Sequence, residues 1–217
     1  MKKTAWVAGA SGLIGGHLMT LLSQSANYEK VVALVREPVD ADWANADTVE
    51  QWCIDYDKLA LPDPETRVNH VFCALGSTTK KTPNKHDYYK IDVDYPLKIA
   101  ELGREQGAQF FGLVSAHGAN ARSLSSYLKM KGKLERLLQK LDYPRLAFAR
   151  PSLLIGEREE HRPLEKFSES FMRAMPGNYK AIAARDVAAA LITEANDIQP
   201  VVRILTSSDM QGASKNA

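Results

Sequence analysis

The sequence predicts an α/β fold, a doubly wound parallel sheet covered by helices on both faces. Apolar, strand-like runs alternate with amphipathic helical stretches along the whole chain. Most of these runs are continuously apolar, as in strands that are buried on both faces. A glycine-rich turn joins the first strand to the first helix. With 217 residues, the chain is long enough for one large core, and we expect a single domain spanning residues 1–217.

The expected elements follow one another in a regular order. The first strand precedes the glycine turn, and later strands are expected at residues 30–35, 49–54, 68–74, 110–115, 146–150 and 201–205. Helices are expected at residues 14–23, 88–106, 127–141 and 185–195. A charged loop at 156–162 leads into a small C-terminal cap at 156–180, and the residues from Gln211 onward are expected to be disordered.

The turn after the first strand has a G-x-x-G-x-x-G pattern, formed by Gly9, Gly12 and Gly15. Ile14 and Leu18 begin a helical apolar pattern directly behind it. Glycine lets a backbone turn tightly and approach a pyrophosphate, and the following helix presents free N–H groups and a positive dipole end. In this setting the pattern predicts a nucleotide-binding turn, and the alternative is a strand–turn–helix corner with glycines for packing.

Composition and charge exclude several classes of partner. The chain is 45% hydrophobic and 25% charged, and its net charge is +2, so we expect no nucleic-acid partner. No apolar run approaches the roughly 20 residues that cross a bilayer, so we expect no membrane span. Lysines gather near Lys80 and near Lys129, where a solvated surface is expected.

The two cysteines and the N-terminus predict the compartment. Cys53 and Cys73 end apolar runs and show no metal-ligand spacing, so we expect reduced core cysteines and no metal site. The N-terminal residues lead into a strand and not into the apolar core of a signal peptide. These features predict a cytoplasmic protein.

The end of the second strand bears on the choice of nucleotide. Sites for NAD usually carry an acidic residue about 20 residues past the glycine turn, where it holds the ribose hydroxyls. Here Val35 occupies the strand end and Arg36 follows it. A guanidinium binds a 2′-phosphate well, so NADP(H) is favoured over NAD(H). Glu37 keeps NAD(H) open as the alternative, and Arg36 could also be an ordinary surface charge.

Ser115, Tyr127 and Lys131 form the candidate catalytic set. Tyr127 and Lys131 are four residues apart, so they share one face of the predicted helix. A lysine ammonium beside a tyrosine would lower the phenol pKa from about 10 toward working pH. Ser115 ends a predicted strand, at the edge where parallel sheets bind ligands. A Y-x-x-x-K pattern alone is common, and its position behind the strand and the glycine turn makes it informative.

Together these motifs resemble those of the short-chain dehydrogenase/reductase family. More narrowly, the chain resembles the atypical branch typified by the Tat-interacting-protein oxidoreductases. The resemblance extends over residues 4–205, and the stretches that carry it are residues 73–79, 92–95, 115–119, 127–135 and 150–158.

The resemblance implies a Rossmann fold that binds a nicotinamide dinucleotide, with roles for individual residues. It places Ser11, Gly12, Leu13 and Ile14 under the pyrophosphate, Asp55 near adenine, Leu75 and Gly76 beside the adenosine ribose, and Pro151 and Leu153 beside the nicotinamide. Lys131 would hold the nicotinamide ribose. The sequence departs from the family at two places: Asp92 stands where many members use asparagine for a proton-relay water, and Arg150-Pro151-Ser152 stands where relatives often have Pro-Gly.

The function expected from these features is carbonyl reduction or its reverse with NADP(H), on a small carbonyl or alcohol substrate. Tyr127 would act as the acid or base, and Ser115 would polarise the carbonyl oxygen. A non-catalytic, redox-sensing NADP(H)-binding regulator is the alternative. An epimerase or dehydratase of nucleotide sugars fits the fold, but residues 156–217 are short for its substrate domain. The sequence leaves a homodimer or a protein partner open.

Overall fold

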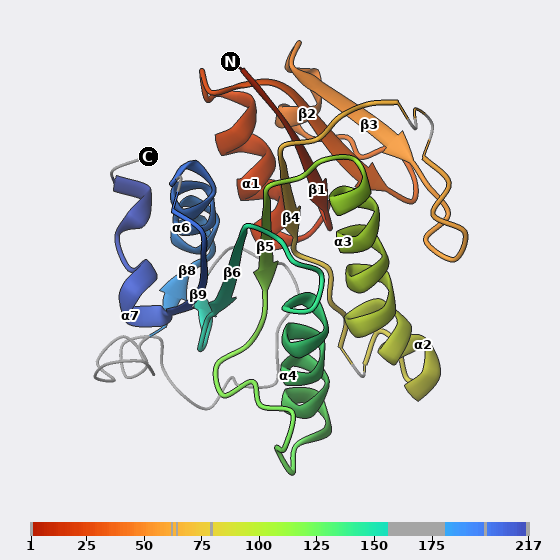
Figure 1. Cartoon of the computed structure of the whole chain (residues 1–217), viewed down its shortest axis with the longest axis vertical. Coiled ribbons are helices and arrows are strands. Elements are labelled where there is room, and N and C mark those ends of the chain that lie inside the picture. Colours follow the sequence, from red (N-terminus) through yellow and green to blue (C-terminus); the bar gives the residue numbers. More distant parts are fainter. Residues whose placement is uncertain are drawn as a thin grey trace.

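A computed structural model of the chain describes residues 2–155, 181–197 and 199–215, apart from Pro62, Pro64 and Thr79. Its centre is a seven-stranded sheet in the order β3-β2-β1-β4-β5-β6-β9 (Figure 1). Every neighbouring pair of strands in this sheet is parallel. The predicted α/β fold with a doubly wound parallel sheet is therefore confirmed.

The strands lie close to their predicted positions. They are β1 (Lys3–Ala8), β2 (Tyr28–Val35), β3 (Val49–Cys53), β4 (His70–Cys73), β5 (Phe110–Val114), β6 (Arg145–Arg150) and β9 (Val201–Thr206). A separate parallel pair, which the sequence did not predict, consists of β7 (Leu154–Ile155) and β8 (Ile182–Ala183).

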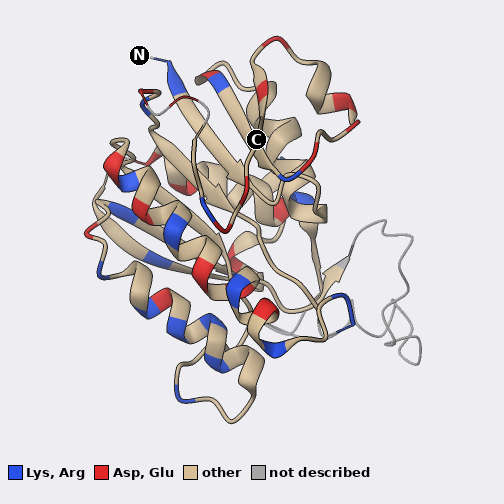
Figure 2. Ribbon diagram, turned by 90° about the vertical axis from the view of Figure 1, so that its right-hand side faces the viewer, with Lys and Arg blue, Asp and Glu red and all other residues tan. Residues whose placement is uncertain are grey.

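Helices cover both faces of the sheet. The α-helices are α1 (Leu13–Ser23), α2 (Lys85–Tyr89), α3 (Tyr95–Glu105), α4 (Ser126–Leu138), α6 (Ala184–Asn196) and α7 (Ser207–Met210), with short 3₁₀ turns at Asp42–Asn45 and Ala213–Lys215. In Figure 1, α1 and α6 lie on one side of the strands, while α3 and α4 lie on the other. Figure 2 shows basic and acidic residues interspersed along the helices on that side of the molecule.

The strands divide their side chains between two cores. Ala5 and Val7 of β1 belong to the core that contains α1 and α6 side chains, whereas Trp6 and Ala8 belong to the core that contains α3 and α4 side chains. All four side chains are fully buried. Successive residues of a strand point to opposite faces, so a strand covered on both faces needs a continuous apolar run.

The order of the strands determines where a ligand can bind. The chain runs outward from β1 through β2 to β3 and then returns to β4 on the other side of β1. The direction of winding therefore reverses between β1 and β4, and ligands of such sheets bind outside the carboxyl ends of the strands at this point. The glycine turn and the segments that follow β4, β5 and β6 all emerge at this edge.

The helix predicted at 88–106 is divided into three segments. The first is α2, whose N-cap residue Asn84 accepts N–H groups from His86 and Asp87 at 2.8 and 3.4 Å. A π-helical segment at Lys90–Asp94 then connects α2 to α3. Apolar periodicity detects helical structure but does not distinguish a π turn from an α turn.

Two local predictions are wrong. Residues 211–215 are ordered by Asp186 of α6, whose carboxylate accepts the N–H groups of Gly212 and Ser214, each at 3.1 Å, and the Ser214 hydroxyl. Cys53 is exposed, because its side chain points away from the core at the end of β3, whereas Cys73 is buried as predicted. The cap predicted at 156–180 lies outside the described residues.

Candidate active site

The glycine turn is fixed by the close approach of three backbone segments. Gly9 has a φ of +85°, and a Cβ there would lie 2.8 Å from the carbonyl carbon and oxygen of Ala74. A Cβ at Gly15 would lie 1.9 Å from the Gly9 carbonyl oxygen. Only glycine fits at either position, so the turn after β1 lies directly against the segment that leaves β4.

The start of α1 is suited to an anion. Gly12 is the N-cap residue and supplies no side-chain cap, and the first turn carries no acidic residue. The first N–H groups of a helix have no partner within it, and the positive dipole end lies there. Gly12 itself donates its N–H to the Gly9 carbonyl at 2.9 Å, which closes the turn. The predicted segment from Ser11 to Ile14 therefore fits a pyrophosphate, and Ser11 is exposed.

The ends of β2 and β3 carry the residues predicted for the adenosine part of the nucleotide. Arg36 and Asp55 are both exposed and follow these two neighbouring strands. The Asp55 carboxylate accepts the Asp57 N–H at 2.9 Å and lies 3.5 Å from the Lys58 ammonium. The segment after Arg36 is held by the Gln51 side-chain amide, which accepts the N–H of Val39 at 2.7 Å and donates to the carbonyl of Val39 at 3.0 Å.

The segment after β4 connects the glycine turn to α4. Ala74 and Leu75 lie against Gly9, and a Cβ built on Gly76 would lie 3.8 Å from the Lys131 ammonium. Leu75 is partly buried and Gly76 is exposed. The predicted ribose-flanking residues therefore link the candidate phosphate site to the candidate catalytic lysine.

Tyr127 and Lys131 lie together on α4. Ser125 caps this helix by accepting the Leu128 N–H at 3.5 Å. The Lys131 ammonium lies 6.0 Å from the centre of the Tyr127 ring. Lys131 is 3% exposed, whereas Tyr127 is 37% exposed and can meet a ligand. Gly132 allows α4 to pack closely, because a Cβ there would lie 2.3 Å from the Ala121 nitrogen.

Lys131 is paired with a buried carboxylate. Its ammonium lies 2.9 Å from Oδ1 of Asp92, which is 1% exposed and belongs to the π-helical segment. The other oxygen, Oδ2, accepts the Ser77 N–H at 3.0 Å. Burial lowers the pKa of Lys131, but the charge of Asp92, the charge of Tyr127 and the hydrogen bond to Asp92 together outweigh burial and hold that pKa above its ordinary value.

Ser115 follows β5 as predicted, but its hydroxyl has a protein partner. The hydroxyl donates to Oε1 of Glu135 at 2.6 Å, and both residues are buried. Arg150 binds the same carboxylate with two guanidinium nitrogens, at 3.0 and 2.5 Å. The proton of Ser115 therefore points to Glu135 and not toward a carbonyl substrate. The role predicted for Ser115 stays a prediction.

Sequence reasoning missed two residues around this set. Glu135 received no role, although it repeats the four-residue spacing of Tyr127 and Lys131 on the same helix face. Tyr88 is half-buried in α2, where burial, together with the charges of Asp92 and Tyr127, raises the pKa of its phenol. No spacing in the sequence indicated that the charges of Asp92 and Tyr127 would act on Tyr88.

The segment after β6 is held in place by backbone bonds. The Pro151 carbonyl accepts the His117 N–H at 2.9 Å, and the Leu153 carbonyl accepts the Ile182 N–H at 2.8 Å. The Ser152 N–H is bound by the Ser207 hydroxyl at 2.9 Å. Pro151 and Leu153 therefore lie at the carboxyl edge of the sheet, where the resemblance expected them beside the nicotinamide.

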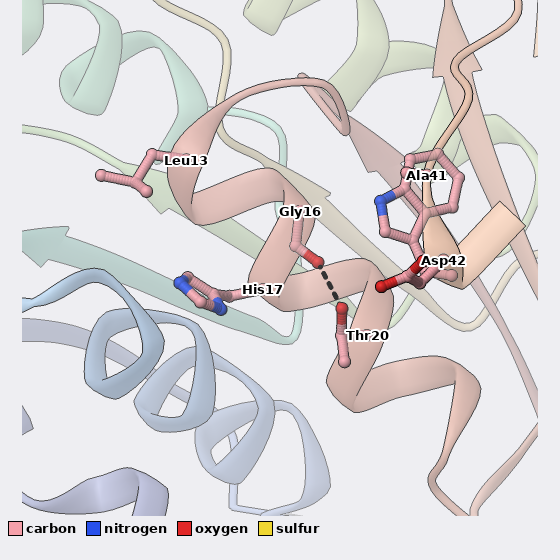
Figure 3. A pocket seen from close by; sticks show the side chains of 7 residues that line it. Leu13, Gly16, His17, Thr20, Ala41 and Asp42 are labelled. Carbon is pink, nitrogen blue, oxygen red and sulfur yellow. Dashed lines mark hydrogen bonds between the residues drawn. The ribbon is translucent and has the colours of Figure 1, made fainter. Parts of the chain in front are cut away.

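A depression on the outer side of α1 shares Leu13 with the candidate phosphate site but lies apart from Tyr127 and Lys131 (Figure 3). Leu13, Gly16, His17 and Thr20 of α1 line it, together with residues 41–43. Burial and then the charge of Arg185 lower the pKa of His17. The depression lies on the face of the sheet opposite α4. Within the described residues no group of three metal-ligating side chains is found, and no described helix is long and apolar enough to cross a membrane.

Comparison with protein families and with curated proteins identifies relatives over most of the chain. The model of the NAD dependent epimerase/dehydratase family matches residues 5–192. HTATIP2 of Rattus norvegicus is 32% identical over 178 residues, which are 82% of this chain and 73% of the relative. The mitochondrial protein FMP52 of Candida glabrata is 31% identical over 96% of this chain and 94% of the relative.

Solved structures share the fold at lower identity. MoeE5 in complex with UDP-glucuronic acid and NAD superposes with a TM-score of 0.72 at 20% identity, covering 94% of this chain and 76% of that chain. The UDP-N-acetylglucosamine 4-epimerase of Methanobrevibacter ruminantium M1 superposes with a TM-score of 0.70 at 17% identity, covering 95% and 77%. These similarities confirm the Rossmann-type fold.

The predicted cytoplasmic location is wrong on these comparisons. FMP52 relatives from several fungi, including that of Eremothecium gossypii at 32% identity, are named as mitochondrial proteins. The prediction depended on reduced cysteines and on the character of the N-terminus. Reduced cysteines fit any reducing compartment, so this feature could not separate the cytoplasm from an organelle.

Proposed function

The chain belongs to the NAD dependent epimerase/dehydratase family and, within it, to the HTATIP2 branch of atypical short-chain dehydrogenases/reductases; from this membership we propose that it is an NADP(H)-dependent oxidoreductase acting on a small carbonyl or alcohol. One observation carries the proposal. A partly exposed tyrosine and a buried, charged lysine lie together on α4, and the segment after β4 connects them to a glycine turn whose helix start is suited to an anion.

The residues of the chain divide the work of binding between them. The glycine turn and the start of α1 would hold the pyrophosphate, and Arg36 would hold the 2′-phosphate. Leu75, Gly76, Pro151 and Leu153 would border the riboses and the nicotinamide. When bound, the nicotinamide nucleotide supplies or accepts the hydride.

Tyr127 would move the proton. Tyr127 is partly exposed, so its hydroxyl would donate a proton to a substrate oxygen during reduction or accept one during oxidation. The Lys131 ammonium would stabilise the phenolate form of Tyr127 and contact the nicotinamide ribose. Because Glu135 holds the hydroxyl of Ser115, we assign the proton transfer to Tyr127, and Ser115 could polarise the carbonyl only after exchanging its partner.

The test is Tyr127→Phe, which removes one hydroxyl and almost no volume. We expect NADPH binding to persist and carbonyl-dependent NADPH oxidation to fall by about 100-fold or more, as for loss of a general acid. Tyr89→Phe is the matched control, because the Tyr89 hydroxyl bonds Lys133 outside the proposed set. The assay follows NADPH absorbance with a panel of aldehydes, ketones and quinones. Full activity in Tyr127→Phe would contradict the proposal.

A second function is favoured by the hydrogen bond of Ser115. Glu135 accepts a hydrogen bond from the Ser115 hydroxyl, so this hydroxyl is not free to polarise a substrate carbonyl. A protein that binds NADP(H) without turnover, as a redox-sensing regulator, would not need such a hydroxyl. The two functions predict different results for the unaltered protein. Tight NADPH binding with no turnover across the whole panel would favour the regulator.

A further inference from the structure

We propose that Asp92 is a positioning residue that holds Lys131 and offsets its charge, so that the Asp92–Lys131 pair sets the pH at which Tyr127 exchanges its proton. This inference rests on the function proposed above, because it concerns the proton that Tyr127 transfers. It assigns a role to a carboxylate in a place where the resemblance led us to expect an amide.

The burial and the separation of Asp92 and Lys131 support a role for Asp92 in positioning the ammonium. Asp92 and Lys131 are 1% and 3% exposed, and their charged atoms are 2.9 Å apart. Neither charge would be stable alone at this depth, because burial without a partner disfavours the ionised form. The two side chains come from different elements, so the pair fixes the Lys131 ammonium relative to the rest of the site.

Three segments of the chain converge on the Asp92 carboxylate. Lys131 reaches it from α4, and Ser77 donates its N–H at 3.0 Å from the segment after β4. Asp92 itself stands in the π-helical segment Lys90–Asp94, a wider turn of the kind that often occurs at functional sites. A Cβ built on Gly76 would lie 3.6 Å from Oδ1 of Asp92, so the backbone of this segment runs beside the carboxylate. The carboxylate therefore connects the proposed ribose-binding segment to the catalytic helix.

Asp92 and Lys131 compensate each other's charge, because the titratable groups around the pair are neutral. The titratable groups that surround the pair are Cys73 of β4, Tyr88 of α2 and Tyr127 of α4. Burial raises the pKa of the Cys73 thiol to about 11, and burial also raises that of Tyr88, so both groups are neutral near neutral pH. The pair is then close to neutral as a whole, and its ammonium stabilises a Tyr127 phenolate less than an unpaired ammonium would.

Replacing the carboxylate by an amide separates the two roles of Asp92, which are to hold Lys131 in place and to offset its charge. Asp92→Asn keeps the shape and an oxygen for Lys131, but removes the negative charge. The Tyr127 phenolate then replaces Asp92 as the negative charge that stabilises the buried Lys131 ammonium, so the phenolate forms at lower pH. A neighbouring charge moves a pKa by roughly 1–3 units, and we expect a downward shift of about 1 unit or more in the Tyr127 titration.

The experiment titrates Tyr127 in the protein without added nucleotide. The ultraviolet absorbance of tyrosinate is recorded against pH for each protein and for its Tyr127→Phe version, and the difference isolates Tyr127. Asp94→Asn, two residues along the same segment, is the matched control and should leave the midpoint unchanged. The pH profile of alcohol oxidation, which needs the phenolate, should move in the same direction.

Lys131→Met provides a second comparison that does not depend on the stability of Asp92→Asn. This variant leaves Asp92 unpaired, whereas the double variant Asp92→Asn/Lys131→Met carries neither charge. We expect the Tyr127 midpoint to be lower in the double variant than in Lys131→Met. Equal midpoints in this comparison, or an unmoved midpoint in Asp92→Asn, would overturn the inference. If Tyr127→Phe still abolishes turnover in that case, the proposed function survives without the role of Asp92.

Discussion

The two halves of the candidate site are built in different ways. The nucleotide half consists of backbone: Gly9, Gly12 and Gly15 lie within one turn and the start of one helix, and their absent side chains create the site. The catalytic half consists of side chains that pair across elements, as Asp92 does with Lys131 and Ser115 with Glu135. A local backbone pattern can therefore be recognised in the sequence, whereas a pairing of side chains from distant positions cannot.

The largest effect should come from the backbone half. Gly15→Ala adds a Cβ that would lie 1.9 Å from the Gly9 carbonyl oxygen, so the turn must shift. We expect a lower unfolding free energy and a loss of NADPH affinity of about 100-fold or more, the scale of a displacement of about 1 Å at a site. Calorimetric titration and urea unfolding measure the two quantities.

The neighbouring glycine is the control for this variant. At Gly16 the nearest atom to an added Cβ is 3.8 Å away, so Gly16→Ala meets no obstacle. Alanine is a better helix former than glycine, and we expect this variant to be more stable by about 0.5–1 kcal/mol with unchanged NADPH affinity. Equal behaviour of the two variants would contradict the close approach described for Gly15.

In the catalytic half, removing a buried charge should lower the free energy of unfolding. Glu135→Gln keeps an acceptor for the Ser115 hydroxyl but removes the negative charge that faces Arg150. We expect unfolding to become easier by about 2–3 kcal/mol, the upper range for a hydrogen bond to a charged group. Loss of a fully buried pair would cost more, but Arg150 is 24% exposed and water can partly solvate it.

Glu101→Gln on α3 is the matched control for Glu135, because Glu101 is exposed. Urea unfolding of both variants gives the comparison, and the control should stay within about 0.5 kcal/mol of the unaltered protein. If Glu135→Gln is equally benign, the Ser115–Glu135–Arg150 contacts contribute nothing to the stability of the catalytic half.

The same contrast explains how much of the structure could be predicted from the sequence. The seven strands of the main sheet, the glycine turn and the Tyr127–Lys131 face follow from short-range patterns, and the structure contains all of them, whereas the pair β7–β8 was not predicted. The Asp92–Lys131 pair joins residues 39 positions apart, and the order of the C-terminal residues depends on Asp186. Such contacts depend on how elements pack, which no local pattern encodes.

The smallest effect should come from Arg36, where the nucleotide half depends on a side chain and not on backbone. Arg36 is exposed at the end of β2, so water weakens any bond that it makes. We expect Arg36→Ala to weaken NADPH binding by about 1–2 kcal/mol, the lower range for a bond to a charged group, and to leave NADH binding nearly unchanged. Arg136→Ala, which removes an exposed arginine from α4, controls for the change in net charge. Calorimetric titration of both nucleotides with the three proteins measures the difference. Equal affinity of the unaltered protein for NADPH and NADH would contradict the assignment of Arg36, and the glycine turn alone would then account for nucleotide binding.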